Sequence, residues 1–151
     1  MNDNGHTGGF TMLKTRREVH HQLEPIGILY GCPGPELEHI ERLSRLVDVP
    51  AGGILCEQGR IPLDCMLVES GRADVVVGGR KVATIGPGET VGELGVLDRG
   101  PRSATVVADT PMRVRVIDAQ DLDTLMEGAP TFTRALLREL SARVRAANHA
   151  P

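Results

Sequence analysis

The middle of the chain, residues 47–118, consists of short β-forming runs separated by turns that contain glycine or proline. The run MRVRVI, which begins at residue 112, alternates apolar residues with arginines. A period of two is typical of a strand that buries one face, so both arginines are expected to face water. Many short strands at this spacing favour a β-sandwich or a closed roll.

Helical patterns flank this segment on both sides. Pro35 suits a first helical position, and apolar residues recur behind it at helical spacing. These residues are Leu37, Ile40, Leu43 and Leu46. After the strands, Asp118 is the expected N-cap of a helix over 119–127, which Gly128 ends. Pro130 then opens a last helix with an apolar stripe. The sequence therefore predicts a mainly β fold with flanking helices.

Length and composition exclude several classes of protein. A chain of 151 residues suggests one domain, which we place at residues 23–151 after a tail at residues 1–22. The formal net charge of -3 and the scarcity of aromatic residues argue against nucleic-acid binding. No run is apolar enough to span a membrane, and the polar N-terminus lacks the pattern of a signal peptide. We therefore expect a cytoplasmic protein without nucleic-acid or membrane partners.

Cysteine and histidine placement gives no sign of catalysis. Cys32, Cys56 and Cys65 fit neither a disulfide framework nor a zinc spacing, so buried free thiols are expected. Their odd number leaves open one exposed, redox-sensitive thiol. No histidine lies between residues 47 and 118, which excludes a metal-binding roll of the cupin type. No nucleophile and base are placed to form a catalytic set, so we predict no enzyme and no metal site.

The stretch VGELGVLDRGPRSATV, residues 91–106, contains the parts of an anion site. Gly92 allows the backbone to approach a ligand closely, and the residues after it can begin a short helix with free N–H groups. Arg102 offers a planar fork of donors that suits phosphate oxygens. Glu93 is an acceptor that suits a sugar hydroxyl. The stretch predicts one pocket for a small molecule that carries a ribose and a phosphate.

The order of helix, roll, phosphate-type turn and two helices resembles the cyclic nucleotide-binding domain, as in bacterial catabolite activator proteins and protein kinase A regulatory subunits. The cassette that binds phosphate in that family reads approximately Phe-Gly-Glu-Leu-Ala-Leu, then Pro-Arg-Ala/Ser-Ala-Thr. This chain has VGELGVL from residue 91 and PRSAT from residue 101. Three further turns fall in the family's order: Pro50-Ala51-Gly52, Ser70-Gly71 and Gly86-Pro87-Gly88. The resemblance implies an eight-stranded antiparallel, jelly-roll-like β-roll with one N-terminal helix, a short cassette helix and two C-terminal helices.

The same resemblance implies the roles of individual residues. Arg102 would bind the cyclic phosphate, and Glu93 would bind the ribose 2′-hydroxyl. Asn148, near the end of the last helix, would be the contact to the base. Backbone groups near the sugar-phosphate would come from Gly92, Leu94, Gly95, Ser103 and Ala104. Whether the Ser103 hydroxyl also touches the ligand stays open.

The resemblance implies a bacterial, non-enzymatic sensor of cAMP in preference to cGMP. Ligand binding would shift the two C-terminal helices against the roll. The output would pass to an effector protein or a fused domain, and the stripe on the last helix would suit a homodimer. The alternative is a ligand-free roll that serves as an interaction or dimerisation module. In that alternative, Glu93 and Arg102 would form a structural salt bridge.

Overall fold

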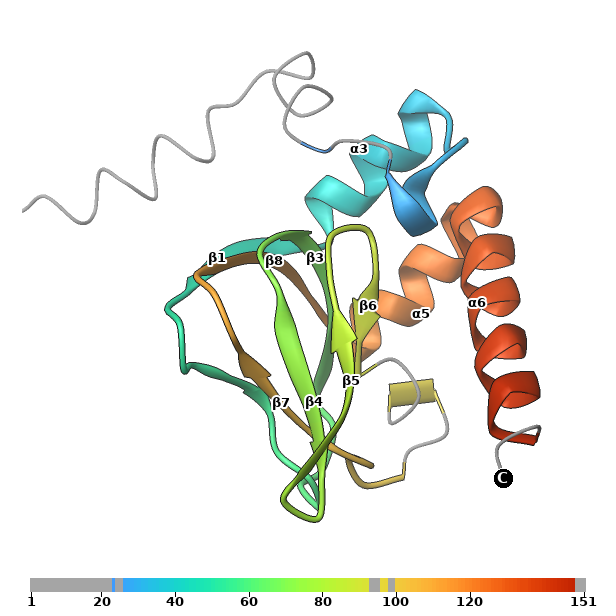
Figure 1. The fold of residues 1–151 in the computed structure, drawn as a ribbon. Coiled ribbons are helices and arrows are strands. Elements are labelled where there is room, and N and C mark those ends of the chain that lie inside the picture. The colour runs from blue at the N-terminus through green and yellow to red at the C-terminus, as the bar shows by residue number, and fades with distance from the viewer. Residues whose placement is uncertain (1–22, 24–25, 93–95, 98–99, 149–151) are drawn as a thin grey trace, which may run out of the picture.

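The computed structural model describes residues 23, 26–92, 96–97 and 100–148, and Figure 1 shows how they are arranged. Within these residues the chain forms eight strands, and every strand pair is antiparallel. The strands are β1 (Arg45–Val49), β2 (Ile54–Cys56), β3 (Asp64–Ser70), β4 (Ala73–Val77), β5 (Arg80–Ile85), β6 (Thr90–Val91), β7 (Thr105–Ala108) and β8 (Met112–Asp118). The mainly β fold with flanking helices is confirmed.

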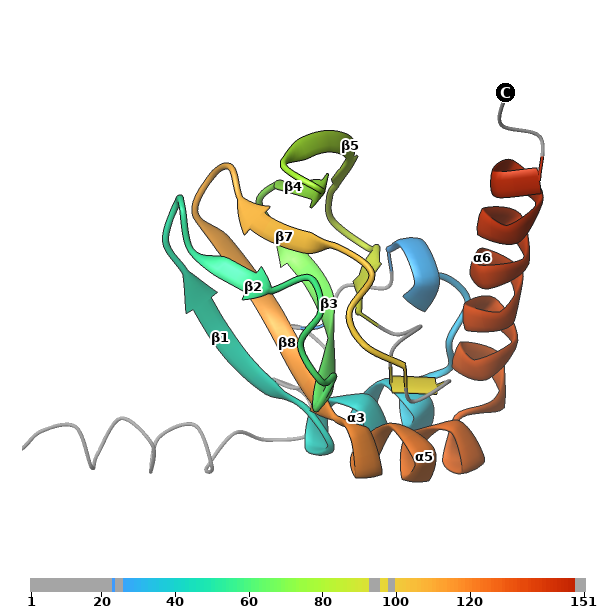
Figure 2. The same ribbon diagram turned by 90° about the horizontal axis from the view of Figure 1, so that it is seen from below.

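The strands form two four-stranded sheets. One sheet has the order β1-β8-β3-β6 and the other has the order β2-β7-β4-β5, and Figure 2 shows strands of both sheets facing one another. The alternation in β8 holds for Arg113, which is exposed, but the expectation is wrong for Arg115, which is only 1% exposed. Arg115 forms ion pairs with Glu41 and Glu69, which are distant from it in the chain, so its charge is balanced inside the protein.

Four helical elements complete the described fold. They are the 3-10 turn η1 (Gly27–Leu29), α3 (Gly34–Arg42), α5 (Ala119–Gly128) and α6 (Pro130–Asn148). The first predicted helix is present but ends at Arg42, and Leu46 lies in β1, so the helical spacing overran the helix. Asp118 stands at the N-cap of α5 without making a cap hydrogen bond, because its carboxylate pairs with Arg45 at 3.1 Å. Of the predicted cassette helix, only residues 96–97 are described.

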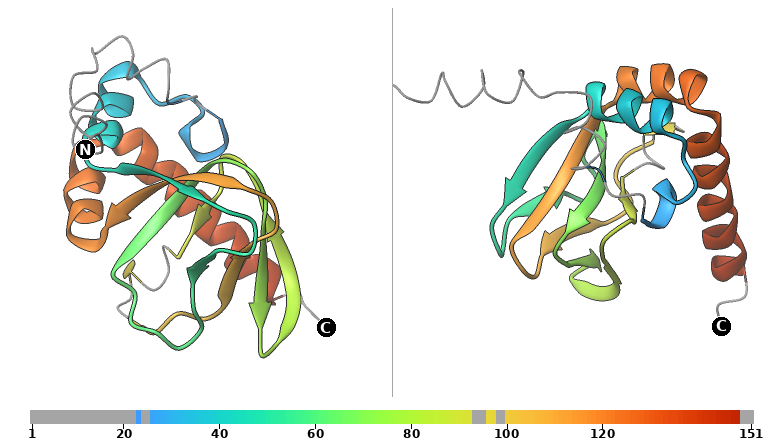
Figure 3. Two further views of the ribbon diagram at one scale, coloured as in Figure 1. Left: turned by 90° about the vertical axis from the view of Figure 1, so that its left-hand side faces the viewer. Right: turned by 90° about the horizontal axis from the view of Figure 1, so that it is seen from above.

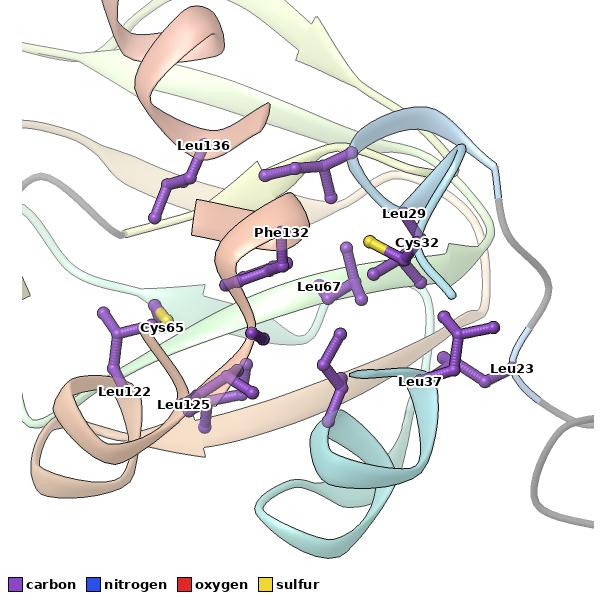
Figure 4. Close-up of a cluster of buried hydrophobic side chains, with 14 residues drawn as sticks. Leu23, Leu29, Cys32, Leu37, Cys65, Leu67, Leu122, Leu125, Phe132 and Leu136 are labelled. Carbon is purple, nitrogen blue, oxygen red and sulfur yellow. The ribbon is translucent and has the colours of Figure 1, made fainter. Parts of the chain in front are cut away.

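Two hydrophobic clusters hold the layers together. One, which includes Val68, Val91 and Val114, fills the roll. The other, shown in Figure 4, contains Leu67 of β3, Leu122 of α5 and Phe132 near the start of α6. Figure 3 shows α3 and α5 side by side at one end of the roll, with α6 running away from them. The first half of α6 therefore belongs to the helical core.

Candidate functional site

A cavity of about 340 Å³ lies between the roll and α6. The face from the roll is mostly apolar, and the polar residues come mainly from β6, from the segment before β7 and from α6. The lining residues are Cys56, Val75, Ala83, Thr84, Ile85, Glu89, Thr90, Val91, Gly92, Arg102, Ser103, Ala104, Val106 and Arg143. Four of the residues predicted from the sequence, Gly92, Arg102, Ser103 and Ala104, therefore lie around one cavity. Glu93, Leu94 and Gly95 fall outside the described residues.

Arg102 is the buried cation of this cavity, with 8% of its surface exposed. Its Nη1 donates to the Gly92 carbonyl at 3.0 Å. Its Nη2 donates to both the carbonyl and the carboxylate of Asp64, at 2.9 and 3.0 Å. Three bonds to fixed acceptors hold the guanidinium in one orientation against the wall of the cavity.

Gly92 is needed for two reasons that the structure makes explicit. Its φ of 80° is in the left-handed region, which side-chain-bearing residues rarely adopt. A Cβ at this position would also collide with the guanidinium of Arg102. The close approach that the sequence predicted is therefore an approach between backbone and arginine.

A polar cluster joins β6 to α6 at the same cavity. Glu139 Oε2 accepts hydrogen bonds from Thr90 Oγ1 at 2.8 Å and from Arg143 Nη2 at 3.2 Å. Arg143 Nη2 also donates to the Thr90 carbonyl at 3.3 Å. The Arg143 side chain, 38% exposed, lines the cavity from α6. Sequence reasoning missed Arg143, although its i,i+4 spacing from Glu139 marks an ion pair on that helix.

The two arginines of the cavity bind backbone carbonyls in or just after β6. The Glu89 carbonyl accepts from the Val68 N–H of the neighbouring strand β3. Because carbonyl directions alternate along a strand, the Thr90 carbonyl faces away from β3, and Arg143 donates to it there. The carbonyl of Gly92, just after β6, accepts from Arg102. Two cations thus line one cavity.

Asn148, the predicted base contact, is exposed at the last residue of α6 and is not among the described residues that line the cavity. Cys32 and Cys65 are buried free thiols, as expected, whereas Cys56 is half-buried and faces the cavity. Burial, with a contribution from Glu36, raises the pKa of Cys32 to about 11. Cys32 is therefore a protonated core residue at neutral pH.

Glu36 of α3 fixes the start of α6. Its carboxylate accepts the backbone N–H groups of Thr131 at 3.1 Å and Phe132 at 3.0 Å. Burial alone would raise the pKa of Glu36, but these hydrogen bonds and nearby Arg134 outweigh it and hold the pKa of this carboxyl below its ordinary value. The carboxylate therefore serves as an N-cap supplied by another helix.

The described residues contain no group of three or more His, Cys, Asp or Glu side chains placed to hold a metal ion. None of the described helices combines the length and apolarity needed to cross a membrane.

The chain is similar to several known proteins. The family model for the cyclic nucleotide-binding domain matches residues 46–129, more than half of the chain. The acetyltransferase Pat of Mycolicibacterium smegmatis is 36% identical over 108 residues, covering 69% of this chain and 32% of that protein. The cAMP-dependent protein kinase regulatory subunit of Schizosaccharomyces pombe is 32% identical over 113 residues, covering 74% of this chain and 27% of that protein. The chain thus spans about a third or less of these two relatives.

Solved structures show the same fold. The catabolite activator protein of Thermus thermophilus superposes with a TM-score of 0.73 at 28% sequence identity, covering 80% of this chain and 59% of that protein. A cAMP-bound PfPKA-R structure gives a TM-score of 0.77 at 20% identity and supports the fold alone.

Proposed function

The chain belongs to the cyclic nucleotide-binding domain family, and we propose that it is a non-enzymatic regulatory module that binds cAMP in preference to cGMP. The observation that carries the proposal is Arg102, a buried guanidinium held against a cavity large enough for a small molecule. Its further N–H donors have no acceptor among the described residues, and the singly charged cyclic phosphate would supply one.

The rest of the cavity suits the sugar and the base. Val75, Ala83 and Ile85 offer an apolar wall for the faces of the nucleoside. Arg143 lies on the α6 side, so in this proposal it contacts the base more directly than Asn148 does. Glu93 keeps its proposed role at the ribose 2′-hydroxyl.

The output would be carried by α6. Its first half is fixed by Phe132 and Leu136 in the helical core, whereas no described residue after Leu140 on this helix is buried. Ligand in the cavity would favour the arrangement in which the second half of α6 lies over β6. Leu137 and Val144 are exposed on this helix, so a homodimer through α6 and an effector protein or fused domain remain part of the proposal.

Thermal unfolding with cAMP, cGMP and 5′-AMP tests the function. A ligand that binds only the folded state adds about 2.7 kcal/mol at a hundredfold excess over its Kd. We expect the largest rise in Tm with cAMP, a smaller one with cGMP, and the smallest with 5′-AMP, which lacks the cyclic ester. Absence of a shift with either cyclic nucleotide at millimolar concentration would favour the ligand-free interaction module instead.

A further inference from the structure

The loop between β2 and β3 carries large apolar side chains into solvent. Ile61 is 80% exposed, Leu63 is 72% exposed, and nearby Ile54 of β2 is 56% exposed. Single exposed apolar residues are ordinary, but a contiguous group on a water-facing surface marks a site of interaction.

These side chains border two adjoining hollows. One hollow, of about 280 Å³, is lined by Ile54, Ile61 and Leu63, and the other, of about 400 Å³, by Ile61, Val96 and Leu97 with the start of α5. Ile61 belongs to both, so the hollows form one surface with Ile61 as the ridge. We call this surface the loop patch. It consists of the exposed Ile54, Ile61 and Leu63, of Pro62, and of Val96 and Leu97, which are half-buried and also pack against the helical core.

The rim of the loop patch carries one exposed carboxylate on the α5 side, that of Asp123. That helix contains Asp121, Asp123 and Glu127 and no lysine or arginine. Asp123 lines the larger hollow, is exposed, and has no salt-bridge partner among the described residues. The arginine within the loop, Arg60, lies 3.7 Å from Glu57, which offsets its charge. A basic partner would gain from this field, and an acidic one would be repelled.

The loop is tied at both ends to Arg102. The Gly59 N–H donates to the Arg102 carbonyl at 2.8 Å, and the Arg102 N–H donates to the Arg60 carbonyl at 2.9 Å. At the other end the Arg102 guanidinium bonds both the carbonyl and the carboxylate of Asp64. Ile61, Pro62 and Leu63 stand between these two attachments, so a shift of Arg102 would also move this part of the loop patch.

We propose that the loop patch docks a protein segment that carries large apolar side chains flanked by lysine or arginine, and that a ligand at Arg102 changes the affinity of this docking. The apolar side chains would fill the two hollows, and a basic one would face Asp123. The coupling to ligand rests on the proposed function, whereas the docking surface does not.

Two synthetic peptides of about twelve residues are the probes, one alternating leucine with lysine and the other alternating leucine with glutamate. Fluorescence anisotropy with the full chain should show the leucine-lysine peptide binding about tenfold or more tightly than its acidic counterpart. The double variant Ile61→Ser/Leu63→Ser should weaken this binding about tenfold. Val82→Ser removes another exposed apolar residue, 60% accessible, from the β4–β5 hairpin and should leave binding unchanged.

The other possible results of these experiments would each contradict one part of the docking proposal. Equal binding of the two peptides, or unchanged binding by the double variant, overturns the docking surface. Light scattering can show whether the double variant converts a dimer to a monomer. In that case the patch binds a second copy of this chain, and the proposed docking of a basic, apolar segment is wrong.

Adding cAMP separates the coupling from the function. If cAMP raises Tm but leaves peptide affinity unchanged, the coupling is wrong and the proposed function stands. If cAMP does not bind, the proposed function and the coupling both fail, while the docking surface is judged by the peptides alone.

Discussion

Arg102 and Arg115 are both buried arginines, and their surroundings differ in one respect. Arg115 lies between two carboxylates, with Nη2 2.7 Å from Glu41 Oε1 and Nε bonded to Glu69. Arg102 has one carboxylate partner among the described residues, Asp64 at 3.0 Å, and a cavity beside it. The protein thus surrounds one guanidinium completely and leaves the other facing a space.

The difference supports the proposed phosphate site at Arg102. A guanidinium with two anions is the arrangement that the fold already uses at Arg115. Asp64 together with a cyclic phosphate would give Arg102 the same composition of one cation and two anions. A buried charge is costly unless it is paired, so the first arginine stabilises the fold and the second has pairing capacity left for a ligand.

The largest expected effect is the loss of Arg115. Replacing it with alanine leaves Glu41 and Glu69 together without their cation, and removal of one member of a buried ion pair costs about 3–5 kcal/mol. Urea unfolding monitored by circular dichroism should show this loss. Arg113→Ala, on the same strand but exposed, should stay within about 0.5 kcal/mol of the wild type. Similar stabilities of the two variants would refute a structural role for Arg115.

Arg102→Ala should act on binding where Arg115→Ala acts on folding. Loss of one partner of a buried charge pair weakens binding by about 2–5 kcal/mol, which corresponds to roughly 1.5 to 3.5 decades of cAMP affinity by calorimetry. Arg102→Lys keeps the charge without the planar fork and should recover only part of that affinity. If Arg102→Ala bound cAMP as the wild type does, Arg102 would not be the phosphate ligand.

Glu36 is a buried carboxylate that, like Arg115, is paired with groups of the protein itself. Its folded-state pKa is lowered, so its stabilisation is present above its usual pKa of 4.5 and is lost as pH falls through the folded value. Glu36→Gln should lower the free energy of unfolding by about 1–2 kcal/mol at pH 7, because the charged cap of α6 is lost. The difference from the wild type should shrink in acid, as unfolding titrations from pH 7 to pH 3 would show. A difference that is constant with pH would exclude the carboxylate charge as its cause.

Local patterns predicted the strands and the two C-terminal helices, because turn residues and hydrophobic periodicity are set by near neighbours, and the resemblance of the cassette predicted the residues around Arg102. The predictions from local patterns were wrong or incomplete where residues distant in the sequence come into contact. The period of two placed Arg115 in water, since nothing near it in sequence shows that Glu41 and Glu69 approach. Arg143 was missed for the same reason: its place in the cavity depends on Thr90, whose hydroxyl and carbonyl face α6 only after the chain folds.

Loss of Arg143 should have the smallest effect on cAMP affinity. It tests whether the α6 side of the cavity contributes to ligand binding. Arg143 binds the Thr90 carbonyl as Arg102 binds that of Gly92, but its side chain is 38% exposed, so water screens its interactions. Arg143→Ala should therefore weaken cAMP binding only about threefold in calorimetry. Arg138→Ala, exposed on the same helix, should leave the affinity unchanged. A loss as large as that of Arg102→Ala would show that the α6 side of the cavity, and not the phosphate end alone, supplies much of the binding energy.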